Sequence, residues 1–204
     1  MAASINSLPV PRGPDMSGQT VLVIGGSSGI GLETARLARA KRADIILTAR
    51  NPDRLHRAGL ELGASIAAFD ATDFGRLRRF FDALPAPIDH LLVAGPGPCC
   101  APLAETDLDA PRRDLDARHL LPLQVARDAA GRVRPGGTLL FMGGTGGRRP
   151  AAGLAVLAAL TAALPARTKS LALQVAPVRV NLIAAGFVDT PLSASLLGDQ
   201  IDKR

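Results

Sequence analysis

Short runs of apolar residues alternate along this chain with longer segments in which apolar residues recur every three or four positions. Runs of about four to eight apolar residues are typical of strands buried on both faces, and the periodic segments are typical of helices that cover such strands. The strands that this pattern predicts span residues 20–24, 44–49, 65–69, 90–94, 138–142 and 178–184. We therefore predict an α/β fold of the Rossmann type: a doubly wound parallel sheet of at least six strands in three α/β/α layers.

The alternation begins at residue 18 and shows no internal boundary. Residues 1–17 are rich in Ser, Pro and Gly and predict a flexible tail, so the predicted domain occupies residues 18–204. A chain of 204 residues is long enough to bury a sizeable core within one domain.

Prolines and a cap residue predict where helices begin or are distorted. Asn51 precedes a proline, which predicts a helix start with Asn as the N-cap and Pro in the first turn. We expect Pro122 to kink a long Arg-rich helix over 109–132, and Pro165 to interrupt an Ala- and Leu-rich helix over 154–175.

A glycine-punctuated turn joins the first predicted strand to the first predicted helix. Gly25 lets the chain turn off the strand, Gly29 lets the backbone approach a phosphate, and Gly31 lets the helix lie close to the sheet. The free N–H groups of the first helical turn then face an anion. The turn therefore predicts a site for the pyrophosphate of a dinucleotide, although an ordinary strand–helix turn remains the alternative. Its predicted contacts are Gly25, Ser27, Ser28, Gly29, Ile30 and Gly31.

The end of the second predicted strand indicates which dinucleotide is bound. In such folds an acidic residue there binds the 2′-hydroxyl of NAD, whereas an arginine accommodates the 2′-phosphate of NADP. Arg50 occupies this place, so we predict NADP(H) rather than NAD(H); a solvated cation is the alternative role. Asp70 and Ala71 end the third strand and are expected to reach the adenine, although Asp70 could instead cap the next helix.

Composition narrows the classes of partner. The net charge of +6 comes almost entirely from scattered arginines, and there is no Trp or Tyr to stack on bases, so we expect no nucleic-acid partner. No cluster of His, Cys, Asp or Glu has the spacing of metal ligands. We interpret the adjacent Cys99 and Cys100 as two small, half-buried side chains, with a redox switch as the alternative. Without a predicted signal peptide or membrane span, we expect a cytoplasmic protein with no membrane partner.

Several segments, taken in order, make the chain resemble the short-chain dehydrogenase/reductase family from Gly18 to about Leu197. The matching segments are residues 25–31, 69–73, 88–95, 136–142, 170–181 and 186–191. The resemblance implies an NAD(P)(H)-dependent oxidoreductase that acts on a small carbonyl or alcohol substrate as a homodimer or homotetramer. It also implies cofactor contacts from Ala94, Gly95, Gly186, Val188 and Thr190. The family fold continues further, so we expect its C-terminal part to be missing here and the sixth strand to be a sheet edge.

The catalytic residues that the resemblance implies are absent. The family uses a Tyr as general acid/base, a Lys four residues later and a Ser after the fifth strand. The alignment places Leu157, Thr161 and Gly144 at these positions, and the chain contains no Tyr at all. The standard mechanism is therefore not open to this chain.

Two residues are candidate substitutes in proton chemistry or carbonyl polarisation. His119 has a suitable unperturbed pKa, and Thr145 could polarise a carbonyl, although a core-edge histidine and a loop hydroxyl are the alternative readings. Arg118, Arg148 and Arg149 could bind an anionic group. Two functions remain: an NADP(H)-dependent oxidoreductase with weak or non-standard catalysis, or a non-catalytic NADP(H)-binding sensor or silent partner subunit.

Overall fold

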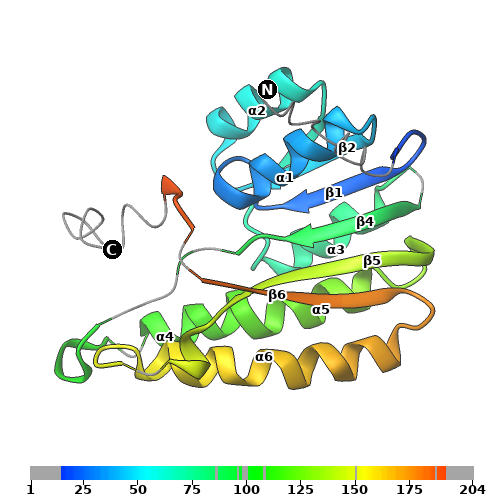
Figure 1. Cartoon of the computed structure of the whole chain (residues 1–204). Helices are drawn as coiled ribbons and strands as arrows, with labels where there is room; N and C mark the ends of the chain where they lie inside the picture. The colour runs from blue at the N-terminus through cyan, green and yellow to red at the C-terminus, as the bar shows by residue number, and fades with distance from the viewer. Residues whose placement is uncertain are drawn as a thin grey trace, which may run out of the picture.

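A computed structural model describes residues 15–85, 87–95, 97, 101–107, 109–149, 151–186 and 188–191. Its centre is a six-stranded sheet in which every neighbouring pair of strands is parallel (Figure 1). The strand order is β3-β2-β1-β4-β5-β6. The strands are β1 (Thr20–Ile24), β2 (Asp44–Ala49), β3 (Ser65–Ala68), β4 (Ile88–Val93), β5 (Val133–Gly144) and β6 (Arg179–Ala185). The predicted doubly wound parallel sheet is confirmed, and β6 forms one edge of it within the described residues.

Helices cover both faces of this sheet because successive strand residues point to opposite faces. In β1, Val21 and Val23 pack towards α1 and α2, whereas Leu22 and Ile24 pack into the core shared with α3, α5 and α6. The helices are α1 (Gly29–Ala40), α2 (Pro52–Leu62), α3 (Phe74–Asp82), α4 (Asp109–Leu115), α5 (Leu121–Asp128) and α6 (Ala155–Gln174). The result is the predicted three-layer arrangement.

Local sequence signals position several of these elements. Asn51 caps α2, since its side-chain oxygen accepts a hydrogen bond of 2.8 Å from the Arg54 N–H, as predicted. Asp73 caps α3 in the same way through the Arg76 N–H at 3.0 Å. These caps fix where the chain turns from strand into helix.

The long helix predicted over 109–132 is divided rather than simply kinked. A π-helical turn, Asp116–Leu120, joins α4 to α5 directly before Pro122. Pro122 has no N–H to donate to the carbonyl of Arg118, four residues earlier, so regular α-helical bonding fails there. The guanidinium Nη1 of Arg167 in α6 donates to that carbonyl instead.

The expected interruption of α6 at Pro165 is wrong: the helix is continuous from Ala155 to Gln174. Pro165 lies on the exposed side, whereas Leu164 and Thr168 on either side of it are buried against the sheet. Packing of this buried face holds the helix together across the one hydrogen bond that proline removes.

Helix α6 combines an apolar sequence with little burial. By length and composition, this helix could cross a membrane, and it is the one helix among the described residues that could. Only 22% of its 18-residue apolar segment is buried. One side packs on the sheet through Thr161, Leu164, Thr168 and Leu171. The opposite side, which includes Ala159, Ala163, Ala166, Ser170 and Leu173, is exposed.

Candidate cofactor and active site

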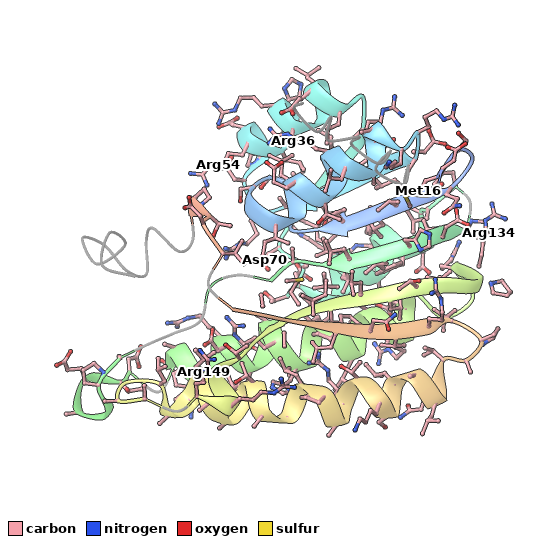
Figure 2. The ribbon with its side chains drawn as sticks, viewed as in Figure 1. Met16, Arg36, Arg54, Asp70, Arg134 and Arg149 are labelled. Carbon is pink, nitrogen blue, oxygen red and sulfur yellow. The ribbon has the colours of Figure 1, made fainter. Side chains whose placement is uncertain are left out.

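The candidate site lies where the carboxyl ends of the strands meet one edge of the sheet. Strand β1 pairs with β2 on one side and β4 on the other, so the chain switches direction of winding beside β1. Ligands of open α/β sheets bind in the crevice at such a switch point. Figure 2 shows Arg54, Asp70 and Arg149 along this edge, with Met16 and Arg134 at the opposite one.

The glycine turn after β1 packs against neighbouring backbone more closely than a side chain would allow. Gly25 has a φ of 87°, and a Cβ atom there would lie 2.0 Å from the carbonyl oxygen of Ala94. A Cβ atom at Gly31 would lie 2.3 Å from the carbonyl oxygen of Gly25. Only glycine allows β1, the start of α1 and the end of β4 to approach this closely.

The N-terminus of α1 opens towards this turn. Ser28 is the N-cap but its hydroxyl makes no capping hydrogen bond, and the first turn contains no acidic residue. The first N–H groups of α1 and the partial positive charge of its dipole therefore remain available for an anion. The side chain of Thr190 lies close by, 3.7 Å from where a Cβ atom of Gly29 would be.

Arg50 and Asp70 lie together at the ends of β2 and β3. Burial alone would raise the pKa of Asp70, but hydrogen bonds from the N–H and hydroxyl of Thr72, at 2.9 and 2.7 Å, and the charge of Arg50 outweigh it. The net effect lowers the pKa, so Asp70 is a carboxylate at neutral pH. Arg50 itself is exposed and forms no salt bridge within the described residues, which leaves its guanidinium accessible to a ligand.

The remaining predicted cofactor contacts line the same edge. Ala94 follows β4 and its N–H donates to the Ile24 carbonyl at 2.8 Å, so its backbone is fixed beside the glycine turn. Gly95 and Gly186 have no atom within 4 Å of an added Cβ, and Val188 is 38% exposed. The structure therefore places these residues at the same edge of the sheet as the glycine turn.

The three positions where the family carries its catalytic side chains also meet at this edge. A Cβ atom at Gly144 would lie 3.9 Å from Cγ2 of Thr161, and one at Gly146 would lie 3.2 Å from Cγ of Leu157. The Thr161 hydroxyl is buried and donates to the Leu157 carbonyl at 2.7 Å within its own helix. These residues therefore lie close together, and they present apolar groups where the family would carry its catalytic side chains.

A short loop after β5 borders these positions. Its 3₁₀ turn (Gly146–Arg148) packs on α6, since a Cβ atom at Gly147 would lie 2.7 Å from the Ala162 nitrogen. Thr145 precedes the turn, and its side chain makes no capping hydrogen bond. Arg148 and Arg149 are exposed, and neither forms a salt bridge in the part of the chain that the structure describes.

His119 bonds to α6 rather than pointing freely into the site. Its Nε2 lies 3.0 Å from the carbonyl oxygen of Leu160, so Nε2–H donates this hydrogen bond. Burial, followed by the charge of Arg167, lowers the pKa of His119 despite this bond. The imidazole is neutral at physiological pH, and the geometry favours a role in linking two helices.

Sequence reasoning missed Arg167, the most unusual charge in the molecule. Its Nε and Nη2 are buried without a hydrogen-bond partner among the described residues, and its guanidinium lies 5.5 Å from the centre of the Phe141 ring. Burial lowers the pKa of Arg167 to about 10. The signal in the sequence was Pro122. It leaves the Arg118 carbonyl without a helical donor, and Arg167 Nη1 donates to that carbonyl instead.

We expect Arg167→Met to raise the free energy of unfolding by about 1 kcal/mol, because removing a desolvated cation that has no counter-ion among the described residues outweighs leaving the Arg118 carbonyl without this donor. Because folding lowers the pKa of Arg167 to about 10, the cost of its charge is fully present below that pH and fades above it. The stabilisation should therefore be constant from pH 6 to 9 in urea unfolding. A variant less stable than the parent would show that the contacts of Arg167 outweigh its desolvation.

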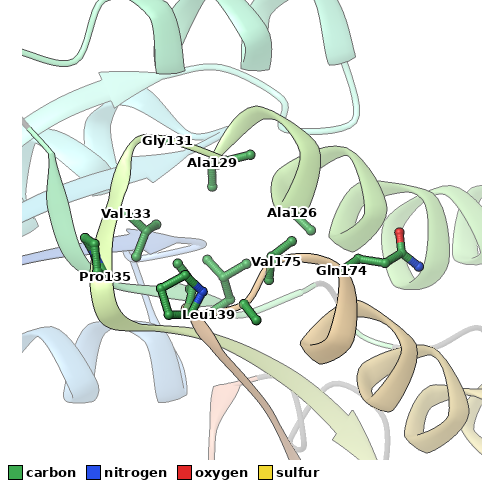
Figure 3. Close-up of a pocket in the computed structure, with 12 residues that line it drawn as sticks. Ala126, Ala129, Gly131, Val133, Pro135, Leu139, Gln174 and Val175 are labelled. Carbon is green, nitrogen blue, oxygen red and sulfur yellow. The ribbon is translucent and has the colours of Figure 1, made fainter.

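Cys99 and Cys100 fall outside the described residues, and the described part of the chain contains no group of three His, Cys, Asp or Glu side chains able to hold a metal. A pocket of about 360 Å³ opens at the opposite edge, between the C-terminal ends of α5 and α6 and the starts of β5 and β6 (Figure 3). Its lining is mainly apolar and includes Ala126, Val133, Leu139 and Val175, with Gln174 as a polar side chain.

Comparison with known proteins agrees with this geometry. A family model described as enoyl-(acyl carrier protein) reductase matches residues 24–203. The chain is similar to the short-chain dehydrogenase/reductase ATR9 of Stachybotrys chlorohalonatus, with 31% identity over 85% of this chain and 75% of that protein. It has the same identity and coverage with the cyclic-di-GMP-binding biofilm dispersal mediator protein of Escherichia coli. The crystal structure of BdcA in complex with NADPH aligns with a TM-score of 0.84 and 27% identity, covering 93% of this chain and 79% of that one.

Proposed function

The chain belongs to the short-chain dehydrogenase/reductase family, and on this premise we propose that it is an oxidoreductase that uses NADP(H) on a small carbonyl or alcohol substrate. The observation that carries the proposal is the cradle at the end of β1. Gly25 and Gly31 let β1, the start of α1 and the end of β4 approach more closely than a Cβ atom would allow, and the N-terminus of α1, which has no side-chain cap, faces this turn. A pyrophosphate is the group that such a cradle accepts.

We infer that the residues around the cradle would hold the whole of this cofactor. The pyrophosphate would be held by Gly25, Ser27, Ser28, Gly29, Ile30 and Gly31, the adenosine by Arg50, Asp70, Ala71, Ala94 and Gly95, and the nicotinamide side by Gly186, Val188 and Thr190. Arg50 supports NADP(H) over NAD(H), because a guanidinium binds a 2′-phosphate that a carboxylate would repel. When bound, the reduced cofactor supplies hydride.

The chain itself would position the substrate rather than exchange protons with it. Leu157 and the glycines after β5 form an apolar surface beside the nicotinamide side, and Thr161 keeps its hydroxyl within α6. General acid catalysis typically contributes about 10²–10⁴-fold, so its loss slows a reduction without preventing hydride transfer. The apolar character of these positions also favours a second candidate function, a non-catalytic NADP(H)-binding protein.

Fluorescence titration with NADPH, and with NADH in parallel, tests the proposal. A chain without Trp or Tyr contributes little emission of its own, so the cofactor signal is clean. We expect saturable binding that favours NADPH. Failure to bind either cofactor would overturn the proposal, whereas binding without turnover on any carbonyl or alcohol would select the non-catalytic alternative.

The exposed side of α6 supports a homo-oligomer, as is common in the family. From Ala159 to Leu173 this side is built mostly from small residues, which allow the backbones of two helices to approach closely, and the exposed Lys169 lies at its margin. A largely apolar helix side of this length would be costly to leave in water. We therefore propose that a second copy of the chain covers it.

We expect Ala166→Arg to convert this oligomer into a monomer, because it places a long cation in the middle of the proposed contact. Light scattering coupled to size exclusion measures the change in mass. Arg57→Glu on α2 is the matched control, since it alters charge at an exposed position on the opposite face of the sheet. An oligomer that survives Ala166→Arg would exclude this side of α6 as the interface.

A further inference from the structure

We propose that the pocket at the edge of the sheet opposite the glycine turn binds a small, uncharged, apolar molecule with the size of two fused rings. The pocket has a volume of about 360 Å³ and lies between the ends of α5 and α6 and the starts of β5 and β6 (Figure 3). The strands separate it from the proposed cofactor site, which lies at their carboxyl ends. The inference therefore goes beyond the proposed function and does not depend on it.

The turns that follow α5 and α6 form two walls of this pocket, and hydrogen bonds hold both turns. After α5, the N–H groups of Arg132 and Val133 both donate to the Ala129 carbonyl, at 2.9 and 3.1 Å. After α6, the Val178 N–H donates to the Val175 carbonyl at 3.0 Å. Because these bonds fix the backbone, the pocket is formed before a ligand arrives, as is usual for small-molecule sites.

A bulge at the start of β5 forms a further wall. Strand β5 falls out of register with β4 between Val133 and Thr138, and Pro135 within this stretch lines the pocket. The Gly136 N–H donates to the Pro177 carbonyl at 3.3 Å, so the bulge is tied to the turn that precedes β6. Hydrogen-bonded backbone therefore bounds the pocket on the side of the sheet as well as on the side of the helices.

The lining that the structure describes presents apolar groups to a ligand. Ala126, Val133 and Leu139 line the pocket and are themselves buried in the core. Gln174 is the one polar side chain of this lining, and its amide turns away from the pocket and donates to Ser170 Oγ at 3.0 Å (Figure 3). A charged or strongly polar ligand would lose hydration without a matching partner from these side chains, whereas an apolar ligand gains dispersion contacts.

The volume of the pocket sets the size of the ligand. An apolar cavity of about 150 Å³ binds benzene. The pocket described here, of about 360 Å³, is more than twice as large, so it has room for about nine to fourteen non-hydrogen atoms. Two fused rings, as in indole or naphthalene, fall within this range. Ordered water is a poor alternative occupant, because a buried water needs polar partners.

Titration of the full chain with indole tests the proposal directly. The chain contains no Trp or Tyr, so the emission reports the indole itself, and this emission moves to shorter wavelength when the ring leaves water. We expect a saturable shift. Purine has the same two-ring shape but polar ring nitrogens, so a tenfold excess of purine over indole should not displace it. Absence of a saturable shift, as when a second copy of the chain covers the pocket, or displacement by purine would overturn the proposal.

Val175→Phe tests whether indole binds in this pocket. The half-buried Val175 lines the pocket, so a phenyl ring there would take the space of the ligand and weaken indole binding by about 10-fold or more. Ala130→Phe, at an exposed lining position, is a second variant that serves if the first does not fold. Leu60→Phe, at a position 72% exposed on α2, is the matched control. Parental affinity in both pocket variants would mean that indole binds elsewhere and would overturn the proposal.

Saturating NADP⁺ separates this pocket from the proposed cofactor site. Unlike NADPH, the oxidised cofactor does not absorb in the range of indole emission. We expect indole affinity to stay unchanged, because the two sites lie at opposite edges of the sheet. Displacement of indole by NADP⁺ would place the probe in the cofactor site and refute the pocket. If NADP⁺ does not bind but the pocket variants weaken indole binding, the cofactor proposal fails alone and the pocket stands.

Discussion

Gly25→Ala is expected to lower the free energy of unfolding by about 2–5 kcal/mol and to abolish NADPH binding. Gly25 has a φ of 87°, where an L-residue is strained, and the new Cβ atom would lie 2.0 Å from the carbonyl oxygen of Ala94. Strain of this kind costs about 1–3 kcal/mol, and forced overpacking costs a similar amount. Relieving the clash moves β1 from the end of β4 and deforms the phosphate cradle. Urea unfolding and NADPH titration measure the two effects.

Gly18→Ala separates the clash from the strain. Gly18 has a similar φ of 74°, but no atom lies within 4 Å of an added Cβ there. We expect it to cost about 1 kcal/mol and to leave NADPH affinity unchanged. Equal losses in the two variants would mean that the close approach at Gly25 does not hold the cradle.

Arg50→Asp is expected to reverse the cofactor preference, with a change of about 100-fold or more in the ratio of NADPH to NADH affinity. The substitution removes a charge-assisted pair with the 2′-phosphate, which contributes about 1.5–3 kcal/mol, and adds a carboxylate that repels the phosphate. The same carboxylate can accept a hydrogen bond from the 2′-hydroxyl of NADH. Parallel titrations with both cofactors give the ratio.

Arg79→Asp is the matched control for this charge change. Arg79 is exposed on α3, on the other face of the sheet. Arg79→Asp alters the net charge of the protein by the same amount as Arg50→Asp, so a general electrostatic effect on phosphate binding would appear in both variants. A preference that shifts equally in both would refute the specific role of Arg50.

The apolar pattern was sufficient to predict the sheet because each buried strand must be apolar on both faces. Strands β1 and β2 match their predicted bounds, and the N-cap at Asn51 is confirmed. These features depend on residues that are close in sequence, where propensity and capping act directly. The length of β5, which extends to Val133, was missed because its first residues include Pro135 and two glycines.

Features that depend on contacts between distant segments could not be read in this way. Local propensity predicts that Pro165 breaks a helix, but packing of α6 on β5 and β6 overrides it. The approach of Gly144 to Thr161 at the edge of the sheet likewise depends on how β5 and α6 pack. The alignment assigned these residues to one site, whereas only the fold reveals that Nε and Nη2 of Arg167 are buried without a hydrogen-bond partner among the described residues.

The hydrogen bond between Arg167 and the Arg118 carbonyl links two distant choices in the sequence. Pro122 creates the free carbonyl and Arg167 supplies its donor, so neither residue is fully explained without the other. Substituting one of the two residues alone has a different consequence for each. Losing the arginine first would leave the Arg118 carbonyl without this donor. Losing the proline first would restore a helical donor to that carbonyl, so the buried cation would no longer be needed there. Among homologous sequences, positions 122 and 167 should therefore covary, with proline and arginine gained or lost as a pair.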